Sequence, residues 1–259
     1  MILDEILAHK RREVEQRKRA RPQSELVAAI TVQPRGFAAA LRPAGLSVIA
    51  EIKRRSPSGG ELRPGASAAD LARLYAANGA AALSVLTDYR YFGGEDNDLV
   101  AARDACALPV LRKDFIVDPY QVYESRALGA DGVLLIVRAL TPTELAHLLQ
   151  LTTEVGLDAL VETHSATEVE LALRAGARVI GVNNRDLDTL LTDPALALRL
   201  RHLVPRDDVF VAESGVSQPA QLAKLAEAQV DAVLIGEALV KAQDPGAKLR
   251  ELTAQAVAR

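Results

Sequence analysis

Short apolar runs recur along the chain, and the segments between them carry apolar residues at helical spacing. Runs such as Val133-Leu134-Leu135-Ile136-Val137 are apolar throughout, which is typical of strands that are buried on both faces of a sheet. The pattern predicts strands at 48–52, 82–86, 110–112, 133–137, 159–161, 179–182, 209–212 and 232–235. It predicts helices at 68–78, 119–128, 143–155, 166–175, 194–202, 218–228 and 245–257.

The repeated order of strand, loop and helix predicts a single (β/α)8 TIM barrel of the α/β class. Eight such units fit a chain of 259 residues, and right-handed crossovers allow the sheet to close. An open doubly wound sheet is the structural alternative. We expect one domain over 1–259, with 1–46 as an N-terminal helical extension that caps the barrel.

The first helix of this extension is amphipathic. Ile2, Leu3, Ile6, Leu7 and Val14 form an apolar stripe, and we expect the basic side chains to face water. These basic residues are Lys10, Arg11, Arg12, Arg17, Lys18 and Arg19. A nucleic-acid-binding arm is the alternative interpretation of the same charges.

Composition indicates a globular protein, with 49% hydrophobic and 25% charged residues. The net charge of -3 gives no broad positive field for nucleic acid. Cys106 is the only cysteine, which excludes an internal disulfide, and we expect it to pack in the helix before the third strand. No signal peptide or membrane-spanning run is visible, so we expect a cytoplasmic protein without a membrane partner, as a monomer or weak homo-oligomer. The four histidines lack metal-ligand spacing, and we expect them at the surface or in helices.

Charged residues follow several of the predicted strands. Lys53 and Lys113 end the first and third strands, Glu162 and Glu213 end the fifth and seventh, and Glu51 shares the inward face of Lys53. In a parallel barrel these strand ends converge on one mouth, where catalytic groups gather. A lysine acid opposite a glutamate base suits proton-transfer chemistry, a Schiff-base lysine is the alternative, and a structural ion-pair network is the non-catalytic interpretation.

Small residues in three loops suggest a phosphate site. The loops are 56–60, 213–217 and 235–238, and the last two follow the final strands, where barrels commonly bind phosphate through backbone N–H groups. Arg185, after the sixth strand, could grip an anion or form a salt bridge with Asp186 or a neighbouring loop acid. Phe92 lies in a flexible loop, which fits either a ring-bearing substrate or a loop anchor.

The ordered motifs resemble indole-3-glycerol phosphate synthase over nearly the whole chain. They are IAEIKRRSPS at 49–58, LSVLTD at 83–88, YFGG at 91–94, LRKDFIVD at 111–118, GVNNRDL at 181–187 and AESGV at 212–216. The resemblance implies a lyase of tryptophan biosynthesis. Its reaction closes the indole ring of 1-(2-carboxyphenylamino)-1-deoxyribulose 5-phosphate and releases carbon dioxide and water, without a cofactor or metal.

The resemblance also implies a role for each matching residue. Lys113 is the expected general acid and Glu162 the general base or proton shuttle. Lys53 is expected to hold the substrate carboxylate and is a candidate second acid, while Glu51 and Asn183 orient these groups. The remaining expected contacts are Arg185, Ser214 and Glu213 for the substrate, Phe92, Phe115, Pro57 and Leu134 for the aromatic ring, and Ser56, Gly215, Gly236 and Glu237 for the phosphate, with Glu237 using its N–H and its carboxylate turned away.

Three rival functions remain at this point. A phosphoribosylanthranilate isomerase would need a cysteine–aspartate pair, but the first strand ends in Lys53 with no cysteine nearby. A Schiff-base aldolase would use a lysine as nucleophile. A catalytically silent phosphate-binding barrel would not need the set of Lys53, Lys113 and Glu162.

Overall fold

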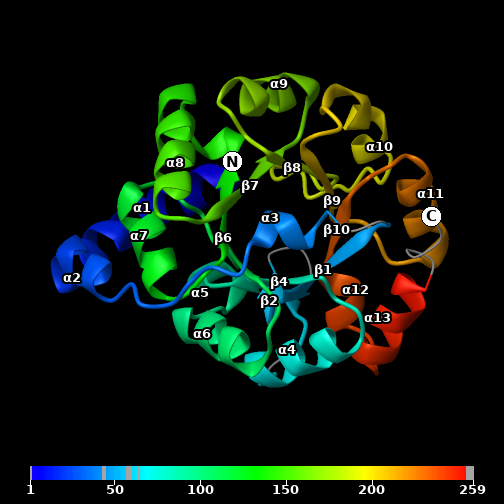
Figure 1. Cartoon of the computed structure of the whole chain (residues 1–259), viewed down its shortest axis with the longest axis horizontal. Helices are drawn as coiled ribbons and strands as arrows, with labels where there is room; N and C mark the ends of the chain where they lie inside the picture. Colours follow the sequence, from blue (N-terminus) through cyan, green and yellow to red (C-terminus); the bar gives the residue numbers. More distant parts are fainter. Residues whose placement is uncertain (1, 43–44, 57–59, 64, 255–259) are drawn as a thin grey trace.

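The computed structural model describes residues 2–42, 45–56, 60–63 and 65–254, with only the backbone of Ser56. Within them, eight parallel strands close into a barrel in the order β1-β10-β9-β8-β7-β6-β5-β4 (Figure 1). The strands are β1 (Ser47–Ile52), β4 (Ala82–Leu86), β5 (Val110–Lys113), β6 (Gly132–Ile136), β7 (Asp158–Thr163), β8 (Val179–Asn183), β9 (Val209–Glu213) and β10 (Ala232–Ile235). The predicted barrel is confirmed, and the open-sheet alternative is wrong.

Helices surround the barrel and begin with strong local signals. In α8 (Pro142–Glu154), Thr141 and Glu144 form a capping box around Pro142, whose missing N–H is harmless in the first turn. The other outer helices are α4 (Ala68–Ala77), α6 (Asp96–Ala105), α7 (Pro119–Ala127), α9 (Ala166–Arg174), α10 (Leu196–Leu200), α11 (Pro219–Glu227) and α13 (Pro245–Thr253). The predicted helix at 194–202 is shorter, because it starts at Leu196 and continues as the 3-10 turn η2 (Arg201–Leu203).

Alternate residues of each strand face the barrel interior or the helices. In β1, Val48 and Ala50 pack under the helices, whereas Ile49 belongs to the interior core. The same parity places Glu51 inside, directly above Ile49 and towards the C-terminal mouth. The period of two therefore decides which polar residues reach the mouth.

The N-terminal extension covers both ends of the barrel. Its first helix, α1 (Ile2–Ala20), contributes Ile2, Leu3 and Ile6 to the cavity at the C-terminal ends of the strands. The third, α3 (Phe37–Ala40), lies across the ring of strands in Figure 1, after α2 (Gln23–Ala28). There Phe37 packs on Gly132, and the Ala38 N–H donates to Asp158 at 2.8 Å, so α3 closes the N-terminal end.

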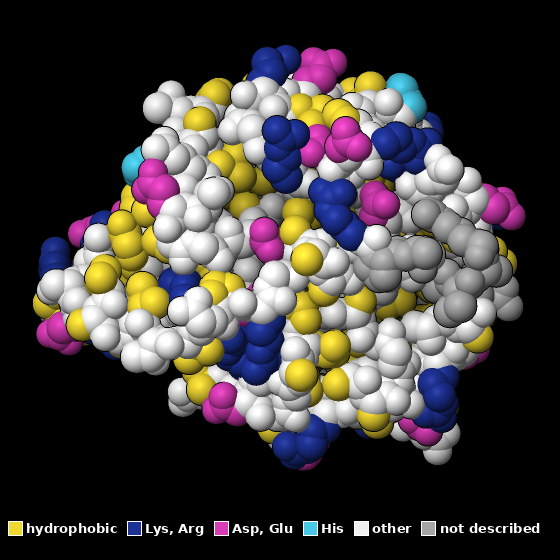
Figure 2. Space-filling view, in the orientation of Figure 1, with side chains coloured by type: hydrophobic (Ala, Val, Ile, Leu, Met, Phe, Trp, Pro, Cys, Tyr) yellow, Lys and Arg dark blue, Asp and Glu magenta, His cyan; other side chains and the backbone are white. Residues whose placement is uncertain are grey.

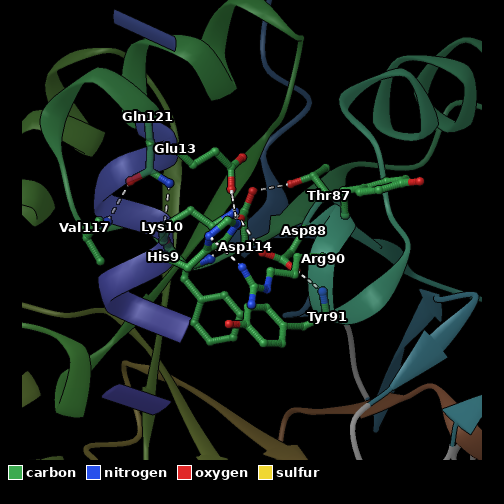
Figure 3. A network of polar contacts seen from close by, with 12 residues as sticks. His9, Lys10, Glu13, Thr87, Asp88, Arg90, Tyr91, Asp114, Val117 and Gln121 are labelled. Atoms are coloured by element: carbon green, nitrogen blue, oxygen red, sulfur yellow. Dashed lines mark hydrogen bonds and ion pairs between the residues drawn. The ribbon is translucent and has the colours of Figure 1, made fainter. Parts of the chain in front are cut away.

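One basic residue of α1 is buried, contrary to expectation. Lys10 is 1% exposed, and its Nζ lies 2.9 Å from Asp88 Oδ2, 2.9 Å from Asp114 Oδ1 and 3.0 Å from Glu13 Oε2 (Figure 3). Asp88 and Asp114 follow β4 and β5, and buried carboxylates are costly unless they are paired. The position that helical spacing assigns to the apolar stripe is therefore occupied by a cation.

The other basic residues of α1 include both paired and exposed side chains. Arg17 is also not simply solvated, because it pairs with Asp96 at 2.8 Å and Glu124 at 3.0 Å. Arg11, Arg12 and Arg19 are exposed as expected. The extension is thus attached to the barrel by charge as well as by its apolar stripe.

Four smaller features complete the description. A two-stranded hairpin, β2 (Arg55–Ser56) with β3 (Gly60–Glu61), was not predicted, because strands of two residues show no periodicity. Cys106 caps the C-terminus of α6 and packs against the core. Charges of both signs are interspersed across the visible face in Figure 2. Among the described residues, no helix has the length and hydropathy to cross a membrane.

Candidate active site

A cavity of about 480 Å³ opens at the C-terminal ends of the strands. Every predicted site residue whose side chain is described lines it. These residues are Glu51, Lys53, Phe92, Lys113, Phe115, Leu134, Glu162, Asn183, Arg185, Glu213, Ser214, Gly215, Gly236 and Glu237. Pro57 lies outside the described residues, as does the side chain of Ser56. The predicted convergence of strand ends on one mouth is confirmed.

The charged floor of the cavity consists of Glu51, Lys53, Lys113, Glu162 and Glu213, and Lys113 stands at its centre. Its Nζ is 3.1 Å from Glu162 Oε2 and 3.6 Å from Glu213 Oε2, across the barrel from β5 to β7 and β9. The side chains of Glu162 and Glu213 are each 1% exposed. Just after β1, the Lys53 ammonium is bonded to Glu51 of that strand.

Electrostatics assign a protonation state to the central pair. Burial alone would lower the pKa of Lys113, but the Glu162 and Glu213 carboxylates outweigh it and raise this pKa above its ordinary value. Burial would raise the pKa of Glu162, but Lys113, His164 and a hydrogen bond from Asn183 hold it below its ordinary value. At neutral pH the pair is therefore an ammonium acid beside a carboxylate base.

Glu213 behaves differently from Glu162. Burial and the neighbouring Glu162 carboxylate raise the pKa of Glu213 to about 8, although Lys113 opposes the shift. Neither carboxyl oxygen has a hydrogen-bond partner among the described residues. Glu213 therefore holds a proton near neutral pH, and of the two carboxyl groups beside Lys113 only Glu162 is ionised.

Two glycines leave room for these carboxylates. A β-carbon on Gly236 would lie 2.1 Å from Glu51 Oε1, and one on Gly181 would lie 2.2 Å from Glu213 Oε1. Both distances are shorter than van der Waals contact, so any larger residue would displace the glutamate. The predicted phosphate-loop residue Gly236 thus has a second, steric reason to be glycine.

Arg185 is held at the rim by Asn183 and Glu237. The Asn183 Oδ1 accepts a hydrogen bond from the Arg185 N–H at 3.0 Å, and the Arg185 guanidinium pairs with Glu237 at 3.1 Å. Asp186 pairs instead with Arg138 at 3.2 Å. The expectation that the Glu237 carboxylate only turns away was incomplete, because it also bridges Arg185 and Lys241, the latter at 2.6 Å.

The cavity has an apolar side and a turn-rich side. The rings of Phe92 and Phe115 lie 6.1 Å apart between centroids, and Leu134 faces the same space. After β9, Ser214 and Gly215 have consecutive positive φ values of 63° and 78°, which makes a sharp turn. An apolar wall therefore faces a tight turn across the mouth.

His164 was missed by the sequence interpretation. It was expected at the surface or in a helix, but it directly follows β7 and is buried. Its Nε2 lies 3.4 Å from Glu162 Oε1. Its position two residues after a strand-end glutamate was the available signal, because side chains two apart on a strand share a face.

A closed (β/α)8 barrel whose strand C-termini bring paired lysines and glutamates into one cavity has the architecture of a barrel enzyme. The model of the family "Indole-3-glycerol phosphate synthase" matches residues 3–252. The chain therefore belongs to the indole-3-glycerol phosphate synthase family.

Close relatives agree with this assignment, and a distant solved structure agrees with the fold. The chain is 50% identical to indole-3-glycerol phosphate synthase 2 of Streptomyces coelicolor, over 97% of this chain and 98% of the relative. It is 46% identical to indole-3-glycerol phosphate synthase of Dehalococcoides mccartyi, over 97% and 100%. The solved thiamine phosphate pyrophosphorylase of Pyrococcus furiosus matches with a TM-score of 0.63 at 16% identity, covering 82% of this chain and 95% of that one, and this likeness shows the fold alone.

Proposed function

We propose that this cavity closes the indole ring of 1-(2-carboxyphenylamino)-1-deoxyribulose 5-phosphate, with loss of carbon dioxide and water. The observation that carries the proposal is the Lys113 ammonium held 3.1 Å from the Glu162 carboxylate on the cavity floor. An acid and a base side by side suit a reaction that protonates a carbonyl oxygen and later removes a proton from carbon.

Lys113 acts first as the general acid. When the aromatic carbon attacks the substrate carbonyl, negative charge develops on the carbonyl oxygen, and a buried ammonium stabilises and protonates it. The raised pKa of Lys113 keeps this group charged throughout the neutral range. Lys53, bonded to Glu51 at the same floor, holds the substrate carboxylate until carbon dioxide leaves.

Glu162 acts as the base in the dehydration. Its lowered pKa keeps it ionised at neutral pH, so it can accept the proton that leaves carbon when the indole double bond forms. Asn183 orients it through a hydrogen bond. Glu213, which holds a proton near neutral pH, contacts the substrate as a neutral group.

The two ends of the substrate have separate surroundings. The aromatic ring lies between Phe92, Phe115 and Leu134 on the apolar side. The phosphate lies against the backbone N–H groups of the β9 and β10 loops, with Ser56 from the first loop and Arg185 at the rim. A phosphorylated small molecule of this size is consistent with the cavity volume of about 480 Å³.

The proposed location is the cytoplasm, with no nucleic acid or membrane partner. Support comes from the biosynthetic family and from the net charge of -3, which gives no broad positive field. The oligomeric proposal is a monomer or weak homo-oligomer.

The direct experiment incubates purified protein with the substrate and follows indole fluorescence together with carbon dioxide release. We expect both signals to rise in parallel. Folded protein that produces neither would overturn the proposal. Borohydride added during turnover separates the aldolase rival, because a Schiff base would leave a covalently modified lysine and the proposed acid–base mechanism leaves none.

A further inference from the structure

His164 lies between two carboxylates behind the reaction cavity. Its Nε2 is 3.4 Å from Glu162 Oε1, and its Nδ1 is 3.4 Å from Glu168 Oε2. The imidazole side chain is 2% exposed. Neither ring nitrogen completes a hydrogen bond within the described part of the chain, which is unusual for a buried polar group.

The two oxygens of Glu162 face different partners. Oε2 lies 3.1 Å from Lys113 in the reaction cavity, whereas Oε1 faces the His164 ring. The Glu162 carboxyl group alone therefore separates the His164 ring from the Lys113 ammonium. His164 has no place in the lining of the reaction cavity, so it acts on the substrate only through Glu162.

Charged groups behind His164 lead outwards to solvent. Glu168 of α9 accepts the His164 backbone N–H at 2.7 Å and pairs with Arg138 of η1 (Val137–Ala139) at 2.8 Å. Arg138 pairs in turn with Asp186, after β8. Side-chain exposure rises along this series, from 1% at Glu162 to 13% at Glu168 and 38% at Asp186.

A second hollow of about 190 Å³ adjoins the imidazole. Most of the residues around it are polar, as water requires. They are His164, Asn183, Asn184, Asp186, Leu191, Thr192, Asp193 and Leu196. Because Asn183 lines both this hollow and the reaction cavity, the two spaces lie on either side of the same strand end.

The proposed reaction consumes a proton. The carbonyl oxygen leaves as water and takes up two protons, while one proton leaves the carbon that enters the indole double bond. The carboxylate departs as carbon dioxide and leaves its bonding electron pair with the ring. Each turnover therefore takes up one proton, which must reach Lys113 and Glu162 before the next cycle.

We propose that His164 is a positioning residue that passes this proton from the solvent side, through the second hollow, to Glu162 Oε1, while the Glu168 carboxylate holds the ring in place. The ring accepts a proton at Nδ1 and donates one at Nε2, and a tautomer change resets it. Rotation of the protonated Glu162 carboxyl group then turns this proton towards Lys113, which has given its own proton to the carbonyl oxygen and becomes an ammonium again. The inference rests on the proposed function, because that reaction sets the proton balance.

The first test replaces His164 with alanine and leaves space for free imidazole. His164→Ala is expected to lower kcat about tenfold to a hundredfold while KM stays within about twofold, since the substrate-facing groups remain. Added imidazole should restore much of kcat in His164→Ala and leave wild type unchanged. His164→Gln fills the space without a titrating ring, and we expect imidazole to have no effect on it.

The second test uses Glu168→Gln, with Glu170→Gln as its matched control. Both glutamates lie on α9, but Glu170 is 58% exposed and pairs only locally with Arg174 in the described structure, at 3.6 Å. Glu168→Gln is expected to lower kcat severalfold at unchanged KM, and Glu170→Gln is expected to match wild type.

Each outcome decides between the proposed proton transfer through His164, called the relay here, and a purely structural role of this residue. A wild-type kcat in His164→Ala, or a loss that imidazole does not reverse, would overturn the relay. If His164→Ala does not fold, a wild-type kcat in folded Glu168→Gln overturns it. Inactive wild-type protein would instead refute the proposed function, so the two failures are distinguishable.

Discussion

Replacing Lys10 with methionine removes the cation that joins α1 to the barrel. The Lys10 ammonium contacts Asp88 and Asp114 at 2.9 Å each and Glu13 at 3.0 Å, and its side chain is 1% exposed. Methionine preserves most of the side-chain volume, so the loss of charge dominates. We expect Lys10→Met to destabilise the fold and to loosen the helix that supplies Ile6 to the cavity roof.

The contacts that Asp88 and Asp114 keep determine how much stability Lys10→Met loses. Removing one partner of a buried ion pair costs about 3–5 kcal/mol. Asp114 keeps a hydrogen bond from Thr87 at 2.7 Å and a contact with Arg112 at 3.4 Å, while Asp88 keeps the Tyr91 N–H at 2.7 Å. This compensation favours the lower end, about 3 kcal/mol, or roughly 6–12 °C in Tm for a chain of this size.

The pH dependence of this stability contribution follows from the same ion pairs. The carboxylates around Lys10 raise its pKa despite burial, so its stabilisation is fully present at neutral pH and is lost only as pH rises through that raised pKa. Burial opposes the lowered pKa of Asp114, but Lys10 and Arg112 outweigh it, so this contribution is lost as pH falls through the lowered value. Lys10→Met should therefore be most damaging near neutral pH.

Thermal and urea unfolding measure the loss, with Lys18→Met as the matched control. Lys18 lies on the same helix, and its side chain is 34% exposed and pairs with Glu15 and Asp118. A partly exposed surface pair of this kind is worth about 0–1 kcal/mol, so Lys18→Met should shift Tm much less than Lys10→Met. The reasoning is refuted if Lys10→Met matches Lys18→Met in stability, or if adding Asp88→Asn to Lys10→Met recovers none of the loss.

Two further predictions concern the cavity floor. In the folded protein the pKa of Glu213 is raised to about 8 from 4.5, so its ionisation destabilises the fold as pH rises through this window. The Tm of Glu213→Gln should therefore rise relative to the Tm of wild type between about pH 5 and about pH 8. A Tm difference that stays constant with pH would contradict the shift. Gly236→Ala would place a β-carbon 2.1 Å from Glu51 Oε1 and displace this carboxylate. We expect kcat/KM to fall at least about tenfold in steady-state assays, while the variant still folds with a measurable Tm. A wild-type kcat/KM would contradict this, because it would show that Glu51 can move without cost.

Strands and their polar ends could be predicted because burial on both faces is visible in the sequence itself. A run such as 133–137 has few other structures open to it, and its end determines which residue reaches the mouth. That is why the sequence predicts Lys113 and Glu162 at the same mouth of the barrel. The roles assigned to them remain predictions that the resemblance supplies.

Buried charges could not be predicted in the same way. Helical spacing placed Lys10 in the apolar stripe of α1, but its charge favoured a solvent position, and the pairing with Asp88 and Asp114 depends on residues more than seventy positions away. Long-range ion pairing leaves no periodic signal. His164 was misplaced for a different reason, because its partners Glu162 and Glu168 are close in sequence and its spacing of two from Glu162 was a signal that the sequence interpretation did not use.

The most direct test of the acid–base account compares wild type with Lys113→Met. Methionine keeps the length of the side chain but removes the ammonium that lies 3.1 Å from Glu162. The account predicts that wild type forms indole-3-glycerol phosphate, and that folded Lys113→Met still binds the substrate but loses at least about a hundredfold in kcat. A Lys113→Met enzyme that turns over at the wild-type rate would contradict it.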